Sequence, residues 1–211
     1  MLGLPPDFDL VVTERRSDVR IVVSLPGRYA LANRRNARGE RQQFACRAIN
    51  ISPSGVALAV PVLGPLGERV LADIEHFGKL EGTIERLLGD RGFVVRMAAS
   101  EQEREKLADR IHWLEKHKNL EVPDQRAQAR FVPNDPYSTL LLADGTVVAC
   151  FIIDLSITGA AVSADFVPAV GTVLAVGKVI GRVARHLDGG FAVQFVQLQD
   201  RENVEALALR K

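Results

Sequence analysis

The architecture of this chain follows from the stretch Asn50-Ile51-Ser52-Pro53-Ser54-Gly55, which is followed directly by Val56-Ala57-Leu58-Ala59-Val60. Ser, Pro and Gly between two apolar runs are typical of a tight turn, and Gly55 is expected to supply a positive φ angle there. The apolar runs, Phe44 to Ile51 and Val56 to Val60, contain β-branched and aromatic residues that favour strands. The stretch therefore predicts a β-hairpin.

The pattern Asn/Asp-x-Ser-x-x-Gly occurs a second time, in Asp154-Leu155-Ser156-Ile157-Thr158-Gly159, 104 residues after the first. Each copy is preceded by two arginines with three residues between them, Arg16 and Arg20 in the first copy and Arg126 and Arg130 in the second. The offset is 110 residues at the arginines and 98 residues at the later Gly-Phe-x-Val segments, which begin at Gly92 and Gly190. An ordered repeat predicts two domains, with the second copy shorter in its first hairpin loop and again between the turn and its last strand.

Short apolar segments separated by turn residues fill the rest of the first copy. Pro26 bends a strand that starts near Ile21, and the polar stretch 33–43 is expected to be a hairpin loop. Further strands are predicted at 70–74, 80–87 and 93–97. Many short strands with evenly spaced turns indicate an antiparallel barrel or a sandwich.

A helix is predicted to start after Ser100, because Ser100 and Glu103 form the pattern of a capping box. Leu107, Ile111 and Leu114 then fall on one face. The predicted domains are a first barrel over 1–99, a helix and linker over 100–123, and a second barrel with a short C-terminal helix over 124–211.

The paired arginines are the residues that point to a function. A guanidinium group offers a rigid fork of donors that fits phosphate oxygens or the O6/N7 edge of guanine. An Asn or Asp side chain can accept from the imino and amino groups of guanine, and the Ser hydroxyl can bond locally. A ligand with two guanines and two phosphates would use both halves of the pattern.

With these motifs the chain resembles two PilZ domains in tandem, the family of bacterial receptors for cyclic di-GMP. The family signature is Arg-x-x-x-Arg near the start of the domain and Asp/Asn-x-Ser-x-x-Gly on a later strand and turn, and both copies fit it. The resemblance implies a mainly β chain of two six-stranded antiparallel barrels, each followed by an α-helix. It also implies two sets of cyclic di-GMP-binding residues, which are Arg15, Arg16, Arg20, Asn50, Ser52 and Gly55 in the first domain and Arg126, Arg130, Asp154, Ser156 and Gly159 in the second.

The two copies differ in charge at two positions of the expected ligand-binding motifs. The first copy has an additional arginine, Arg15, where the second has Gln125, and it has Asn50 where the second has Asp154. In the family a doubled arginine is associated with an intercalated dimer of the ligand, and a third guanidinium would offset the charge of four phosphates. The first domain is therefore expected to be the stronger site, and the second could be degenerate and serve as a docking surface.

Composition excludes several other classes of function. A net charge of +1 gives no general attraction to DNA or to an acidic membrane, and the start of the chain has no signal-peptide pattern. Cys46 and Cys150 occupy the same position of the repeat, so we expect two buried thiols in a reducing cytoplasm and no disulfide. No catalytic or metal-binding motif is found, and four scattered histidines do not form a metal site, so neither catalytic residues nor a cofactor are expected.

The sequence thus predicts a cytoplasmic signalling adaptor that binds cyclic di-GMP, changes the orientation of its domains and acts on an unknown downstream protein in motility, exopolysaccharide or biofilm control. The leading alternative is a protein-interaction module with this fold that has lost nucleotide binding in one or both barrels. Binding of single-stranded nucleic acid is disfavoured by the near-neutral charge and the aromatic content of 6%.

Overall fold

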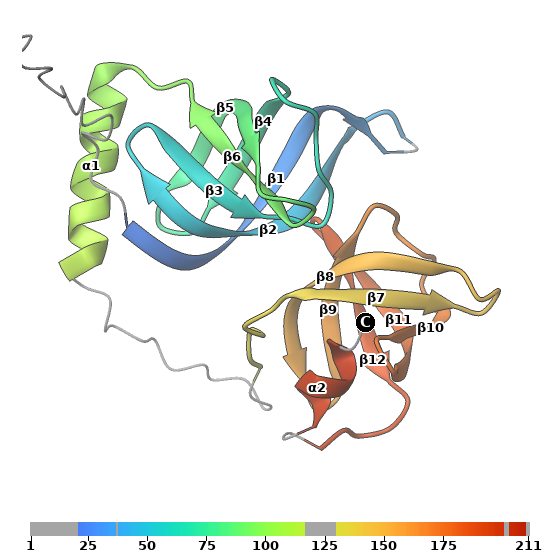
Figure 1. Ribbon diagram of the computed structural model, residues 1–211. Helices are drawn as coiled ribbons and strands as arrows, with labels where there is room; N and C mark the ends of the chain where they lie inside the picture. Colours follow the sequence, from blue (N-terminus) through green and yellow to red (C-terminus); the bar gives the residue numbers. More distant parts are fainter. Residues whose placement is uncertain (1–20, 37, 117–129, 201–202, 210–211) are drawn as a thin grey trace, which may run out of the picture.

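The computed structural model describes residues 21–36, 38–116, 130–200 and 203–209 and consists of two closed β-barrels, each followed by a helix (Figure 1). The strands of the first barrel are β1 (Ile21–Arg35), β2 (Arg41–Ser52), β3 (Gly55–Ala59), β4 (Arg69–Ile74), β5 (Gly78–Leu87) and β6 (Gly92–Met97), and α1 (Glu101–Lys116) follows. The second barrel has β7 (Tyr137–Leu142), β8 (Val147–Ser156), β9 (Gly159–Ala164), β10 (Val173–Val176), β11 (Val179–Leu187) and β12 (Gly190–Phe195), followed by α2 (Val204–Ala208).

The two barrels have one topology. The strands of the first barrel are hydrogen-bonded in the order β1, β2, β3, β6, β5, β4, and those of the second in the order β7, β8, β9, β12, β11, β10, all antiparallel. When the second set is renumbered from one, the orders are identical. The prediction of two six-stranded antiparallel barrels is therefore confirmed, and the sandwich alternative is excluded.

The pairing register of the two motif hairpins agrees residue by residue. Ser52 pairs with Gly55 in the first barrel as Ser156 pairs with Gly159 in the second. Both hairpins also have a β-bulge directly before the Asn or Asp of the motif, because the register shifts by one residue between Ala48 and Asn50 and again between Ile152 and Asp154. A bulge bends its strand and changes the direction of the neighbouring side chains, so the Asn or Asp is presented in the same way in both copies.

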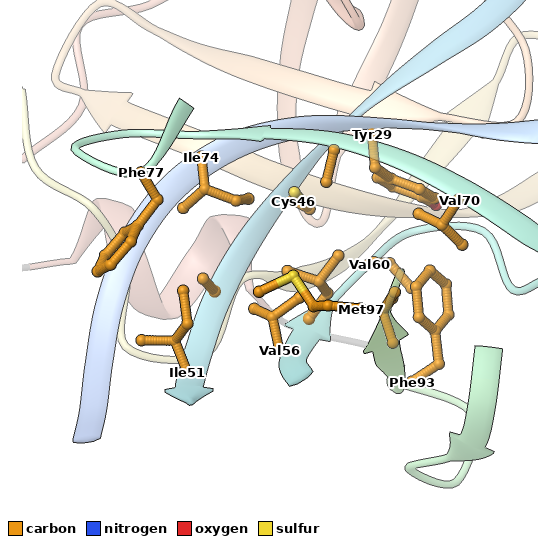
Figure 2. Close-up of a cluster of buried hydrophobic side chains, with 14 of the residues drawn as sticks. Tyr29, Cys46, Ile51, Val56, Val60, Val70, Ile74, Phe77, Phe93 and Met97 are labelled. Atoms are coloured by element: carbon orange, nitrogen blue, oxygen red, sulfur yellow. The ribbon is translucent and has the colours of Figure 1, made fainter. Parts of the chain in front are cut away.

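The core of the first barrel is built around three aromatic rings. The ring centroid of Tyr29 lies 5.5 Å from that of Phe44 and 5.6 Å from that of Phe93. Figure 2 shows Tyr29, Val70 and Phe93 meeting in the interior from three different strands. The Tyr29 hydroxyl donates to the carbonyl oxygen of Val62 at 2.5 Å, which satisfies the polar end of a ring that is otherwise buried.

The two cysteines lie at equivalent places inside the barrels. Cys46 on β2 and Cys150 on β8 are both buried and both free. Burial raises the pKa of both thiols, that of Cys150 to about 12. The expectation of two buried, unpaired thiols is confirmed.

Helix α1 begins as its capping box predicts. The Ser100 backbone N–H donates to the Glu103 carboxylate at 2.8 Å, and the Glu103 N–H donates back to the Ser100 hydroxyl at 3.4 Å. Leu107 and Ile111 are buried in the core of the first barrel, and Leu114 is partly buried against it. The helix therefore lies along the outside of the first barrel (Figure 1).

The hairpin loop predicted over 33–43 is present but shorter than expected, because β1 continues to Arg35 and β2 begins at Arg41. Two polar residues of this stretch contact the second barrel: Arg34 forms an ion pair with Asp165 at 3.0 Å, and the Gln42 side chain donates to the Asp165 carbonyl oxygen at 3.2 Å. These contacts give polar strand residues a partner that the local sequence does not reveal. The second copy is shorter here as predicted, but the difference lies in the strands, since β1 has 15 residues and β7 has 6.

The barrels meet along β2 and β8, near the centre of Figure 1. The Ala45 N–H donates to the Gly189 carbonyl oxygen at 3.2 Å and to the Ser163 hydroxyl at 3.1 Å. Three ion pairs join arginines of the first barrel to aspartates of the second, which are Arg28 to Asp188, Arg34 to Asp165 and Arg91 to Asp135. The junction thus combines backbone hydrogen bonds with complementary charge.

Candidate functional site

The predicted site residues divide into those within the described residues and those outside them. Arg15, Arg16, Arg20 and Arg126 lie outside the described residues. The structure describes Asn50, Ser52 and Gly55 of the first copy and Arg130, Asp154, Ser156 and Gly159 of the second. The second copy is therefore the one in which an arginine and the later motif can be seen together.

In the second barrel the structure brings Arg130 and Asp154 into contact, although 24 residues separate them in the sequence. The next residue, Phe131, forms an isolated antiparallel bridge with Leu155, and each N–H donates to the other's carbonyl oxygen at 2.9 Å. This bridge sets Arg130 beside Asp154, and the Arg130 Nη1 donates to both carboxylate oxygens at 3.2 Å. The Nε and Nη2 groups of Arg130 stand outside this ion pair, so the guanidinium retains donors for another acceptor.

The Arg130 and Asp154 side chains are partly open to solvent, with exposed fractions of 38% and 23%. Water and salt can screen a pair at this exposure, so its contribution to stability is only about 0–1 kcal/mol. A weak pair can be opened by a ligand at small cost.

The motif serines hold the turns. Ser156 donates from its hydroxyl to the Gly159 carbonyl oxygen at 3.2 Å, and Ser52 does the same to Gly55. Each serine also contacts the hydroxyl two residues later, at 3.2 Å in the second copy and 3.3 Å in the first. Both serines are buried, at 7% and 2% exposure, so the expectation that the Ser hydroxyl bonds locally is confirmed.

The explanation given for the motif glycine is wrong. Neither Gly55 nor Gly159 has a positive φ angle. A Cβ on Gly159 would lie 2.4 Å from the carbonyl oxygen of Val193, and one on Gly55 would lie 2.9 Å from that of Val95. Glycine is required here because the neighbouring strand passes too close for any side chain, so it holds the motif turn against the last strand of its barrel.

The first copy repeats this frame with a neutral side chain. Ile21 pairs with Ile51 in the register that Phe131 and Leu155 adopt in the second barrel, and Val22 pairs with Asn50. The residues that precede Ile21, including Arg20, lie outside the described residues. The frame for a second site is thus present, with an amide in place of the carboxylate.

One residue beside the second site was missed by reasoning from the sequence. Arg47 on β2 is only 8% exposed, donates from Nη1 to the Pro133 carbonyl oxygen at 2.8 Å, and lies with Cζ 6.0 Å from the ring centroid of Phe151. Burial lowers the pKa of its guanidinium. A signal was present in the repeat, because Arg47 occupies the same repeat position as Phe151, so the two copies differ there by a charge.

The described residues were also considered as membrane-spanning helices and as metal ligands. None of the helices that the structure describes has the length and apolar character needed to cross a membrane. In the same part of the chain, no group of three or more His, Cys, Asp or Glu side chains is placed to hold a metal ion.

The geometry defines a protein with two barrels of one topology, in which the second carries an arginine and an aspartate paired beside a Ser-x-x-Gly turn. Residues 124–210 match the family model of the PilZ domain. The matched residues include all six strands of the second barrel and α2. The match covers the copy that the sequence motifs alone ranked second.

Several solved structures are similar to this chain at low sequence identity. The Borreliella burgdorferi PlzA protein in complex with c-di-GMP is 11% identical, with a TM-score of 0.28 and coverage of 89% of this chain and 91% of that one. The Bacillus subtilis inhibitor of motility MotI/DgrA is 10% identical, with a TM-score of 0.29 and coverage of 89% and 94%. Escherichia coli YcgR in complex with c-di-GMP is 15% identical, with a TM-score of 0.26 and coverage of 86% and 79%. No curated protein sequence matches the chain.

Proposed function

We propose that this chain is a cyclic di-GMP receptor and that its main site lies on the second barrel. The site consists of Arg126, Arg130, Asp154, Ser156 and Gly159. The observation that carries the proposal is the contact between Arg130 and Asp154 beside the motif turn, within the domain that matches the PilZ model. This reverses the order in which the sequence motifs ranked the two copies.

The chemistry of the pair fits a guanine nucleotide. The Nε and Nη2 donors of Arg130, which lie outside its ion pair with Asp154, can bind a phosphate or the O6/N7 edge of guanine, and the Asp154 carboxylate can accept from the imino and amino groups of a base. The buried Ser156 and the close-packed Gly159 keep the turn in place and so fix the position of Asp154. Arg126, four residues before Arg130, would supply the second guanidinium of the signature.

The first barrel is a candidate for a second, separate site. Its motif turn has the same hydrogen bond from the serine hydroxyl to the glycine carbonyl oxygen and the same bulge as the second, and Asn50 takes the place of Asp154. Arg15, Arg16 and Arg20 would complete this site, together with Ser52 and Gly55. With three arginines and no carboxylate, it suits a more highly charged ligand, such as an intercalated dimer of the nucleotide.

As a receptor, the chain would act as a cytoplasmic adaptor and not as an enzyme. Binding would change the relative orientation of the barrels, and a downstream protein would read the new arrangement. The domain limits proposed for this behaviour are 1–99 and 124–211, with a helix and linker over 100–123.

The proposal is tested by calorimetric titration of cyclic di-GMP into the intact chain and into Arg130→Ala and Arg16→Ala. Loss of charged hydrogen bonds worth about 1.5–3 kcal/mol each weakens the affected site about tenfold or more. Arg182→Ala is the matched control, since it removes the same charge from an exposed position of the same barrel.

We expect the larger loss in Arg130→Ala and little change in Arg182→Ala. A larger loss in Arg16→Ala would move the main site to the first barrel. If the intact chain gives no binding by calorimetry or by a second assay, the receptor proposal fails, and the alternative of a protein-interaction module with this fold is favoured.

A further inference from the structure

The segment 131–136, which connects Arg130 to β7, is held in an unusual way. Its two ends are tied to β8 by the bridge between Phe131 and Leu155 and by the Ile152 N–H, which donates to the Pro136 carbonyl oxygen at 2.6 Å. Between these ends the segment is not part of a strand, and Pro133 is buried. The support that a paired strand would provide must therefore come from other groups.

That support comes largely from the first barrel. Arg47 donates to the Pro133 carbonyl oxygen, and Arg91 forms an ion pair with Asp135 at 3.2 Å. On the other side, the Asn134 N–H donates to the Glu205 carboxylate of α2 at 3.3 Å. Of these three contacts, the one made by Arg47 is the most buried, so it loses least to solvent screening.

Arg47 also reaches the strand that carries the aspartate. Its guanidinium lies over Phe151, three residues before Asp154 on β8, while its hydrogen bond falls on Pro133, three residues after Arg130. The Arg47 side chain of the first barrel thus contacts both the segment that follows Arg130 and the strand that leads to Asp154.

We infer that Arg47 is a positioning residue for the nucleotide site of the second barrel, so that the first barrel completes a site made of second-barrel residues. This inference rests on the proposed function, because it concerns the affinity of that site for cyclic di-GMP. Without Arg47 the segment 131–136 keeps its two ties to β8 and its exposed contacts with Arg91 and Glu205, but it loses its most buried contact outside β8. Arg130 then samples more positions, and the ligand must restrict them when it binds.

The test is titration of cyclic di-GMP into the full chain and into Arg47→Met, which keeps an unbranched apolar stem of the side chain without its donors. We expect the affinity to fall about tenfold, a change of the size given by one lost charged hydrogen bond. Arg34→Gln is the matched control, because it removes an ion pair of the same domain junction that does not contact the segment 131–136. Its affinity is expected to stay within about twofold of the parent chain, below the change expected from loss of a contact at the site.

A second measurement separates positioning from a general loss of structure. In an Arg130→Ala background, Arg47→Met should have little further effect on affinity, because the residue it positions is already gone. If Arg47→Met does not fold, Arg47→Lys takes its place, with a smaller loss of about threefold, since lysine keeps the charge but not the planar fork.

The outcomes distinguish a failure of the proposed receptor function from a failure of the proposed role of Arg47. If the parent chain does not bind cyclic di-GMP, the proposed function itself fails. If the parent binds and the Arg47 variants bind as tightly as Arg34→Gln, the receptor proposal stands and the role of Arg47 is overturned. Equal losses from Arg47→Met with and without Arg130 would likewise overturn it.

Discussion

Replacing Gly159 tests why the site motif contains a glycine. A Cβ at this position would lie 2.4 Å from the carbonyl oxygen of Val193, closer than a carbon and an oxygen can approach, so β9 and β12 must move apart to accept it. Insertion of an atom into a closely packed region costs about 1–3 kcal/mol. Because the obstacle is a backbone atom and not a flexible side chain, we expect a cost near the top of that range for Gly159→Ala.

Gly145 provides the matched comparison in the same barrel. It has a φ angle of +84° and open space where a Cβ would be, so Gly145→Ala meets only backbone strain, which costs about 1–2 kcal/mol. Asparagine adopts positive φ more readily than alanine and is also larger. Gly145→Asn should therefore be less destabilising than Gly145→Ala, whereas Gly159→Asn should be more destabilising than Gly159→Ala.

Differential scanning calorimetry of the full chain measures these effects, with a shift in melting temperature of about 2–4 °C for each kcal/mol in a chain of this size. The four variants need only be ranked within each pair. If asparagine is better tolerated than alanine at Gly159 as well as at Gly145, the packing explanation is wrong, and the glycine serves the backbone angle after all.

Three further predictions concern single groups. Asp154→Asn keeps an oxygen acceptor, so the affinity of this variant for cyclic di-GMP should fall by about threefold, compared with about tenfold for Asp154→Ala. Calorimetric titration of both variants measures the difference. Equal losses of affinity would mean that only the charge of Asp154 matters. Burial raises the pKa of Tyr137 to about 12 and also raises that of Tyr29 well above its ordinary value. The raised pKa of Tyr137 therefore stabilises the folded state below pH 10, and this stability is lost as the pH rises from 10 to 12. Absorbance of tyrosinate at an ordinary pKa near 10 in the folded protein would contradict this. Cys46 and Cys150 should not react with a thiol reagent at neutral pH until the chain unfolds, and labelling of the folded protein at the rate of an exposed thiol would contradict their burial.

The sequence predicts most of this fold because its signals are local. A turn rich in Ser and Gly, a capping box and runs of β-branched residues each depend on neighbours within a few positions, and the structure contains them where they were expected. The predicted bounds of the loop over 33–43 were too wide for the opposite reason. Its strand residues are stabilised by contacts such as that of Arg34 with Asp165, 131 residues away, which no local pattern contains.

The members of the candidate site could be predicted from the sequence, but the packing that holds them in place could not. The motifs identify Arg130 and Asp154 as members of one site, and the structure brings them together. The sequence does not indicate that the serine is buried or that the glycine makes room for a neighbouring strand, because both depend on the distance between strands that are far apart in the chain. The repeat shows that Arg47 differs in charge from Phe151, but an arginine in an apolar strand fits either a surface position or a domain junction, so the contact of Arg47 could not be predicted.

The difference between Arg47 and Phe151 explains how two copies of one fold can take different roles. At this repeat position the first barrel has a cation and the second has an aromatic ring, and the structure places the cation over the ring. Identical residues at both positions would bring two rings or two like charges together, and like charges at a buried contact would repel. Divergence at this position therefore avoids the repulsion that two arginines would produce between β2 and β8, and the contact of these strands places the first barrel beside the segment that leads to Arg130. A chain in which Arg47 and Phe151 are exchanged keeps the cation and the ring but moves the donor away from Pro133, so we expect it to retain the junction while losing affinity for cyclic di-GMP.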